Sequence, residues 1–214
     1  DIYKLSMDTA RRNAEGISPV LPVLQEIENV NEKAQWSEVL GKAMDFGLWA
    51  MYVDADAMNS SMNILNEYQA GFALSQKDYY VDNDEHTKHI RAEYVKHVEK
   101  MFTLFGIDNA AEKAQTVLRL ETRLANAALS NVELRDPVAN YNKMSVEELQ
   151  KLVPEVNWEV YFAGMNIAPD SLSVGQVRHL QEAGKMLVEE SLEDMKTLFT
   201  WQVIDGSSDF LTEE

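Results

Sequence analysis

The chain has 214 residues, enough to bury a sizeable core, and its 45% hydrophobic and 26% charged residues are typical of a folded globular protein. Its net charge of −17 argues against binding to nucleic acid or to anionic lipid, because phosphate groups would repel it. The absence of cysteine excludes disulfides and thiolate metal sites, and no apolar run reaches the roughly 20 residues needed to span a bilayer.

Helical patterns fill the first part of the chain. One covers residues 3–14 and ends at Gly16, a residue typical of helix C-termini. Ser18 and Pro19 open a second, and a third covers 35–47. The apolar face of the second helix is expected to contain Leu21, Leu24 and Ile27.

The spacing of apolar residues changes after the third helix. Apolar side chains alternate with small or polar ones over residues 49–53 and again over 62–68, around a polar connection at 56–61. Alternation on both sides of a polar turn is typical of two antiparallel strands. The sequence therefore predicts one small β-hairpin at about residues 48–68.

Two long amphipathic helices follow the hairpin. The first spans 84–105 and ends at Gly106. We expect Asp108 to cap the second, which reaches about Ala128. The residues expected to be buried between these helices are Ile90, Tyr94, Val98, Leu118 and Leu124.

Shorter helical segments complete the chain. Pro137 interrupts the pattern, and Ser145 with Glu148 forms a capping box for a helix that ends near Pro154. Further helices are expected at 158–163, 177–188 and 192–204. No self-similar period is present, which argues against a helical repeat. The fold class we predict is mainly α, an irregular multi-helix domain with one small β-hairpin.

Residues 71–80 read GFALSQKDYY and are the most informative segment. They resemble the glycine-leucine-proline-x-x-aspartate-tyrosine-tyrosine signature of the neprilysin family of zinc endopeptidases, which includes endothelin-converting enzyme and bacterial oligopeptidase O. The chain departs from the family pattern at Ala73 and Ser75, and at Ser6, where the family has cysteine.

Other segments resemble the family in the same order along the chain. Together, their order and spacing make the resemblance fairly specific. They are residues 2–8, 13–16, 120–125, 135–137, 141–145 and 199–201, and Trp158.

The resemblance implies a part of an enzyme that does not carry out the chemistry. Family members have two lobes around a closed, water-filled cavity, and the catalytic lobe carries the zinc-binding His-Glu-x-x-His motif. This chain is similar to most of the second, helical lobe, which limits access to short peptides. We therefore expect 1–214 to be a single helical lobe truncated at both ends. Its partners would be the catalytic lobe of the same polypeptide and short peptide substrates.

The resemblance also sets expectations for cofactor, source and compartment. Zinc would belong to the absent catalytic domain, so the parent would be a metalloendopeptidase while this chain alone is predicted to be inactive. Bacterial relatives occur in the cytoplasm and in the cell envelope or periplasm, which leaves the compartment open. The cysteine-free composition favours a bacterial source.

The sequence contains no zinc-peptidase motif, because none of its histidines (His86, His89, His97 and His179) is followed by glutamate. His89, Glu93 and His97 recur at four-residue steps on one helical face, which allows either a surface metal site or an ordinary solvated face. Residues 82–93 imitate a calcium loop but lack its central glycine, so we interpret their carboxylates as turn and capping groups. We predict no catalytic and no metal-binding residue in this chain.

Arg135 and Tyr80 are the two candidate site residues. In the family resemblance Arg135 belongs to an elbow between two helices, where it could donate to Glu121 or Asp136. Loop arginines near a cleft also bind carboxylates, so a role in the substrate cavity is the alternative. We interpret Tyr79, Tyr80, Trp158 and Trp201 first as packing anchors. The rival to the enzyme-lobe hypothesis is a freestanding α-helical protein-interaction module without activity.

Overall fold

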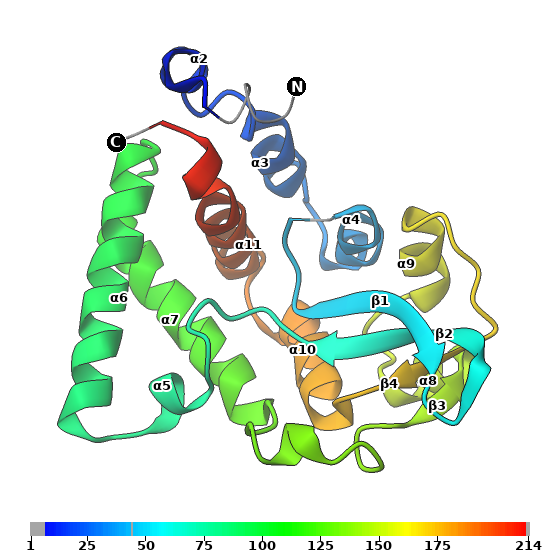
Figure 1. Ribbon diagram of the computed structural model, residues 1–214. Helices are drawn as coiled ribbons and strands as arrows, with labels where there is room; N and C mark the ends of the chain where they lie inside the picture. Colours follow the sequence, from blue (N-terminus) through cyan, green and yellow to red (C-terminus); the bar gives the residue numbers. More distant parts are fainter. Residues whose placement is uncertain (1–6, 44, 213–214) are drawn as a thin grey trace.

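The structure is a computed structural model that describes residues 7–43 and 45–212. It is mainly helical with one small sheet, as predicted (Figure 1). The two long helices lie on one side of the molecule, the sheet lies on the other, and α10 (Val177–Glu189) and α11 (Leu192–Ser207) lie between them. Within the described ranges, no helix is long and apolar enough to cross a membrane.

The first part of the chain forms α2 (Thr9–Glu15), α3 (Leu21–Glu28), the 3-10 turn η1 (Lys33–Gln35) and α4 (Trp36–Lys42). The predicted start of the first helix lies partly outside the described residues. Two other predictions were wrong. Leu21 is exposed rather than on the buried face. The helix at α4 ends at Lys42 instead of reaching 47, because the backbone at Ala43 is extended.

The predicted hairpin is present as β1 (Trp49–Asp56) and β2 (Asn59–Gln69), paired antiparallel. It belongs to a larger sheet with strand order β1-β2-β4-β3. Strand β4 (Ser171–Val174) runs parallel to β2, and β3 (Lys143–Ser145) pairs antiparallel with β4. Strands β3 and β4 were not predicted, because strands of three and four residues are too short to show alternation.

After the short α5 (Asp78–Val81), the predicted long pair is formed by α6 (Glu85–Leu104) and α7 (Ala110–Ala127). Asp84 caps α6 by accepting from the backbone N–H of Thr87 at 3.0 Å. The predicted cap at Asp108 was wrong. The N-cap of α7 is Asn109, which has a left-handed backbone (φ 57°) and makes no side-chain capping bond.

The buried face of the long pair differs slightly from the prediction. Tyr94, Val98 and Leu124 are buried as expected, whereas Ile90 and Leu118 are only half-buried. On α7 the neighbouring positions Val117 and Leu120 take the core positions instead. Neighbouring helical residues point about 100° apart, so a small rotation of the helix decides which of them is buried.

The C-terminal half contains η2 (Glu133–Arg135), α8 (Val146–Leu152), α9 (Trp158–Gly164) and η3 (Ser208–Phe210). The predicted capping box of Ser145 and Glu148 is present. Helix α11 passes through the core, and its Phe199 packs edge-on against Trp36 with ring centroids 4.9 Å apart. The sheet, α4 and α9 thereby share one hydrophobic core with the long helical pair.

Candidate functional site

The segment at residues 71–80 leaves the sheet just after β2 and turns at Gly71. This residue has φ +94°, a conformation that favours glycine. A side chain there would also lie 2.7 Å from Leu124 Cδ2 and 2.9 Å from the Cα of Leu48. The glycine therefore allows the segment to pass between α7 and the start of β1.

Glu121 of α7 holds this segment in place from inside the core. Its side chain is fully buried and accepts hydrogen bonds from the Tyr94 hydroxyl at 2.7 Å and the Tyr80 hydroxyl at 2.9 Å. The backbone N–H of Ala73 donates to its second oxygen at 3.2 Å. Trp201 extends the network by donating its indole N–H to the Tyr94 hydroxyl at 2.8 Å. One carboxylate thus joins residues 71–80 to α6, α7 and α11.

Burial raises the pKa of Glu121 to about 7, although the two tyrosine hydroxyls partly oppose that shift. The pKa values of Tyr80 and Tyr94 are also raised, first by burial and then by the Glu121 charge. All of these groups are closed to solvent, and none reaches an open cavity with a nucleophile. The arrangement suits holding a loop in place rather than catalysing a reaction.

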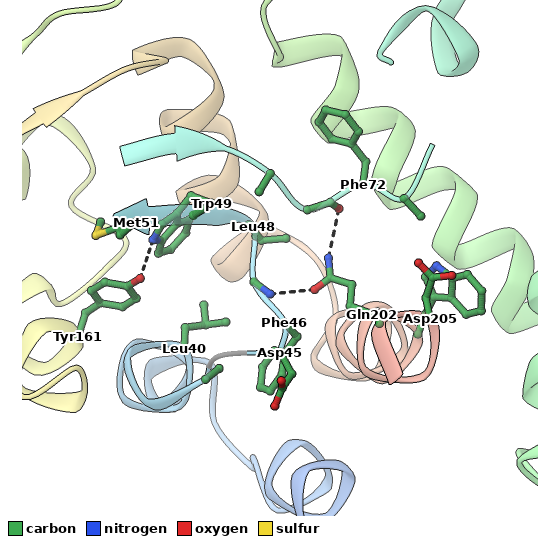
Figure 2. Close-up of a pocket in the computed structure, with 18 of the residues that line it drawn as sticks. Leu40, Asp45, Phe46, Leu48, Trp49, Met51, Phe72, Tyr161, Gln202 and Asp205 are labelled. Carbon is green, nitrogen blue, oxygen red and sulfur yellow. Dashed lines mark hydrogen bonds between the residues drawn. The ribbon is translucent and has the colours of Figure 1, made fainter. Parts of the chain in front are cut away.

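A pocket of about 510 Å³ opens beside this segment (Figure 2). This volume is within the range of small-molecule sites. Its walls come from α4, the connection into β1, the start of β1, the segment after β2, α9 and α11. The side chains that line it are mainly apolar and include Leu40, Phe46, Leu48, Trp49, Met51 and Phe72.

Two hydrogen-bonded groups give the pocket a fixed shape. The side chain of Gln202 accepts from the backbone N–H of Gly47 at 2.9 Å and donates to the carbonyl of Gly71 at 3.2 Å, as Figure 2 shows. Trp49 donates its indole N–H to the Tyr161 hydroxyl at 3.0 Å. The connection into β1, the loop after β2 and α9 are therefore held together around the pocket.

The charged residues that line the pocket, Asp45 and Asp205, are both acidic. Burial, together with nearby Asp209, raises the pKa of Asp205, while His97 opposes that shift. No lysine, arginine or histidine is among the lining residues within the described part of the chain. The pocket therefore combines apolar walls with a negative potential.

The structure does not bring the two candidate site residues together. Tyr80 is buried in the Glu121 network, whereas Arg135 is exposed on η2. The expected bond from Arg135 to Glu121 or Asp136 is absent among the described residues. Instead, Asp136 accepts from the backbone N–H groups of Val138 and Ala139, each at 3.0 Å, and thereby holds the elbow.

The histidines do not form a metal site. Within the described ranges, no group of three or more histidine, aspartate or glutamate side chains could hold a metal ion. His97 packs edge-on against Trp201. His179 is fully buried and donates from Nε2 to the Ala70 carbonyl at 3.0 Å, and burial lowers its pKa to about 4.

Sequence reasoning missed the pocket residues, above all Gln202, Phe46 and Trp49. The pocket is assembled from four stretches of the chain, 40–51, 70–73, 161–165 and 201–206, so no local sequence pattern predicts it. One local signal was Gly71, a glycine where the backbone turns and passes close to neighbouring groups.

Comparison with known proteins gives a consistent family assignment. The model of Peptidase family M13, in its N-terminal part, matches residues 1–214. Endothelin-converting enzyme-like 1 of Mus musculus is 34% identical over 114 residues, which cover 52% of this chain and 15% of that protein. Endothelin-converting enzyme 1 of Rattus norvegicus is 22% identical over 228 residues, which cover 99% of this chain and 30% of that protein.

Solved structures show the same similarity in three dimensions. The zinc metalloprotease Zmp1 of Mycobacterium tuberculosis, in complex with an inhibitor, is 26% identical with a TM-score of 0.92, and the match covers 99% of this chain and 33% of that protein. PepO of Lactobacillus rhamnosis is 19% identical with a TM-score of 0.76, which supports the fold alone. The chain therefore spans about a third or less of the length of these relatives.

Proposed function

The chain belongs to peptidase family M13, and from this membership we propose that residues 1–214 form the non-catalytic helical lobe of a neprilysin-like zinc metalloendopeptidase. The observation that carries the proposal is the match of nearly the whole chain to one third of the Zmp1 zinc metalloprotease. The remaining two thirds of that protein has no counterpart here, and we assign peptide-bond hydrolysis to that part.

The described residues of this chain do not fit a zinc ion. Protein zinc is held by three or four ligands within about 2.0–2.3 Å, drawn from histidine, cysteine and carboxylate side chains. The chain has no cysteine, and within residues 7–43 and 45–212 no suitable cluster of the other ligand types occurs. We therefore assign zinc, and the catalytic step that depends on it, to the catalytic lobe of the parent.

In this proposal the lobe acts by enclosure. A lobe that covers a cavity excludes bulky substrates and bulk water, and it contributes to catalysis through access and positioning rather than through a reacting group. Its partners are the catalytic lobe of the same polypeptide and the short peptides that enter. The net charge of −17 opposes a role in nucleic-acid binding.

A length series of peptides tests enclosure in the full-length parent. All peptides carry the same scissile sequence, and turnover is compared between the parent and a version that lacks residues 1–214. We expect removal of the lobe to abolish the preference for short peptides. Thermal melts show whether the shortened version is folded, and adding chain 1–214 in trans should restore the size limit.

An unchanged size limit in a folded, active version without the lobe would contradict the proposal. The chain would then be better described as an α-helical interaction module attached to the peptidase. The trans experiment remains informative if the shortened version is inactive, because recovery of activity on addition of the chain would show that the two lobes act together.

A further inference from the structure

Strand β1 forms a free edge of the sheet. It is the first strand in the order β1-β2-β4-β3 and pairs only with β2. Within the described residues no other segment forms a backbone hydrogen bond with it. Alternate N–H and C=O groups of an antiparallel strand point away from its partner, so β1 presents a row of such groups on its outer side.

This edge lacks the usual protection against pairing. Natural edge strands are commonly blocked by charged side chains, especially lysine, by proline, by bulges or by short length, and the charges of β1 begin only at Asp54. The eight residues of β1 read WAMYVDAD and contain neither lysine nor proline. Tyr52 and Val53 are 49% and 66% exposed, and the only irregularity in its pairing with β2 is at the far end, between Ala55 and Asp56. The first part of the strand is therefore open to strand addition.

The pocket described above adjoins the start of the same edge. Trp49, Ala50 and Met51 belong both to β1 and to the pocket lining. A peptide paired with β1 would therefore place one of its side chains at the pocket mouth. The Gln202 bridge and the Trp49–Tyr161 bond form the pocket in advance, which lowers the cost of binding.

The negative charge of this surface favours a basic peptide. No lysine, arginine or histidine occurs between Lys42 and Lys77, a stretch that contains the whole hairpin and most of the pocket rim. Asp54 on β1 and the pocket residues Asp45 and Asp205 form no ion pair within the described part of the chain. A cationic side chain placed beside them would find complementary charge.

We propose that the β1 edge and the adjoining pocket bind an extended basic peptide by strand addition. Main-chain hydrogen bonds to β1 would supply affinity, an apolar side chain would enter the pocket, and lysine or arginine side chains would lie beside the acidic residues. This inference rests on the proposed function, because it names the class of peptide that the helical lobe recruits. It concerns binding only, and the bond-breaking chemistry stays with the other lobe.

The first test is calorimetry of chain 1–214 with three acetylated, amidated hexapeptides. The probe has the sequence VKFKVK, one control replaces every lysine by glutamate, and the other keeps the sequence but is N-methylated at alternate backbone nitrogens. We expect both controls to bind at least about tenfold more weakly than the probe, because each lacks one of the two recognition elements. Equal binding of the N-methylated peptide would mean simple charge attraction and would overturn strand addition. So would the absence of binding by the probe.

Matched variants locate the site. Asp54→Lys should weaken the probe at least about fivefold, whereas Glu99→Lys on the exposed face of α6 makes the same charge change and should leave binding almost unchanged. Ala73→Trp fills the pocket rim and should weaken binding, in contrast to Ala92→Trp on α6. Equal effects within either pair would place the peptide elsewhere and overturn the proposal.

Hydrogen exchange of residues 49–56 separates this inference from the enclosure role. Bound probe should slow amide exchange in β1, both in the chain alone and in the full-length parent. If these amides are already protected in the parent without peptide, another part of the polypeptide covers the edge and the inference fails. The size limit of the parent is measured in a separate experiment. Peptide binding at β1 and the enclosure role can therefore be contradicted independently.

Discussion

Glu121 is a fully buried carboxylate with hydrogen-bond donors around it but no cation in contact. Burying a charge is costly, and short bonds from hydroxyl groups offset part of that cost. The carboxylate belongs to α7, while its donors come from α6 and from residues 71–80. The position of the signature segment therefore depends on this one side chain.

Replacing Glu121 with alanine should strongly destabilise the folded chain. The change leaves the hydroxyls of Tyr80 and Tyr94 and the N–H of Ala73 without their acceptor and creates a cavity, so we expect a loss of roughly 3–5 kcal/mol in the free energy of unfolding. Glu121→Gln retains an acceptor oxygen and should cost clearly less. Urea unfolding of the three proteins checks this, and a loss below about 1 kcal/mol for the alanine variant would contradict the account.

Glu67 of β2 provides a prediction about pH. Its side chain is buried, one oxygen accepts from the Gln176 N–H at 3.3 Å, and the other has no partner, so burial raises its pKa from 4.5 to about 8. Between those pH values the folded chain keeps a proton that the unfolded chain releases. Stability contributed by this group is therefore present at low pH and is lost as pH rises towards about 8.

Glu67→Gln should remove that pH dependence. The free energy of unfolding of the unmodified chain should fall relative to the variant between about pH 5 and about pH 8, with a slope approaching about 1.4 kcal/mol per pH unit. Urea unfolding at several pH values gives the difference. Glu121 titrates in the same direction but is present in both proteins, so the comparison isolates Glu67. Parallel curves for the two proteins would mean that Glu67 has an ordinary pKa.

At the scale of elements, α4 and α9 cross with their backbones in close contact. A Cβ on Gly41 would lie 2.2 Å from the carbonyl oxygen of Tyr161, and one on Gly164 would lie 2.9 Å from the carbonyl carbon of Gly41. The crossing also positions Leu40 and Tyr161, which line the pocket. Two small residues therefore fix one wall of the site.

Gly41→Ala should separate these helices, and Gly206→Ala in α11 is its control. We expect the first change to cost more than about 2 kcal/mol, because the obstructing atom is backbone and cannot rotate away. At Gly206 nothing lies within 4 Å of an added Cβ, so alanine should stabilise the chain by about 0.4–1 kcal/mol. Thermal unfolding compares the two, and equal shifts would contradict the close crossing.

The long elements could be predicted from sequence, whereas the tertiary assembly could not. The helical period over α6 and the capping box of α8 were sufficient to predict these two helices, because both signals depend on residues close together in the sequence. Strands β3 and β4 depend on each other and on β2, far away in the chain, and Asn109 begins α7 through its backbone conformation alone. The Glu121 network was missed for a related reason. The partners of Glu121 come from α6 and from residues 71–80, and only packing brings them to it.

At the scale of the whole molecule, an ion-pair network ties the long helical pair to the C-terminal helices. Arg123 of α7 bonds to Glu182, Glu189 and Glu190, and Arg119 bonds to Glu190 and Asp194. These arginines offset part of the large negative charge on this side. The hairpin side has no comparable group of cations, since no basic residue occurs between Lys42 and Lys77. Cations are thus unevenly distributed, and the acidic residues that line the pocket, Asp45 and Asp205, form no ion pair within the described residues.

Arg135 and Tyr80 should behave differently in the full-length parent. Arg135 is exposed and its guanidinium has no hydrogen bond within the described residues, so it is free to bind a substrate carboxylate, whereas Tyr80 is 3% exposed and bonded to Glu121. If Arg135 binds substrate, Arg135→Ala should raise KM about tenfold for a peptide with a free C-terminal carboxylate and leave kcat nearly unchanged. The KM for the same peptide with an amidated C-terminus should be unaffected.

Tyr80→Phe should lower the melting temperature and change the kinetics of both peptides equally, because it acts through the fold. Equal effects of Arg135→Ala on the two peptides would assign Arg135 to the elbow alone.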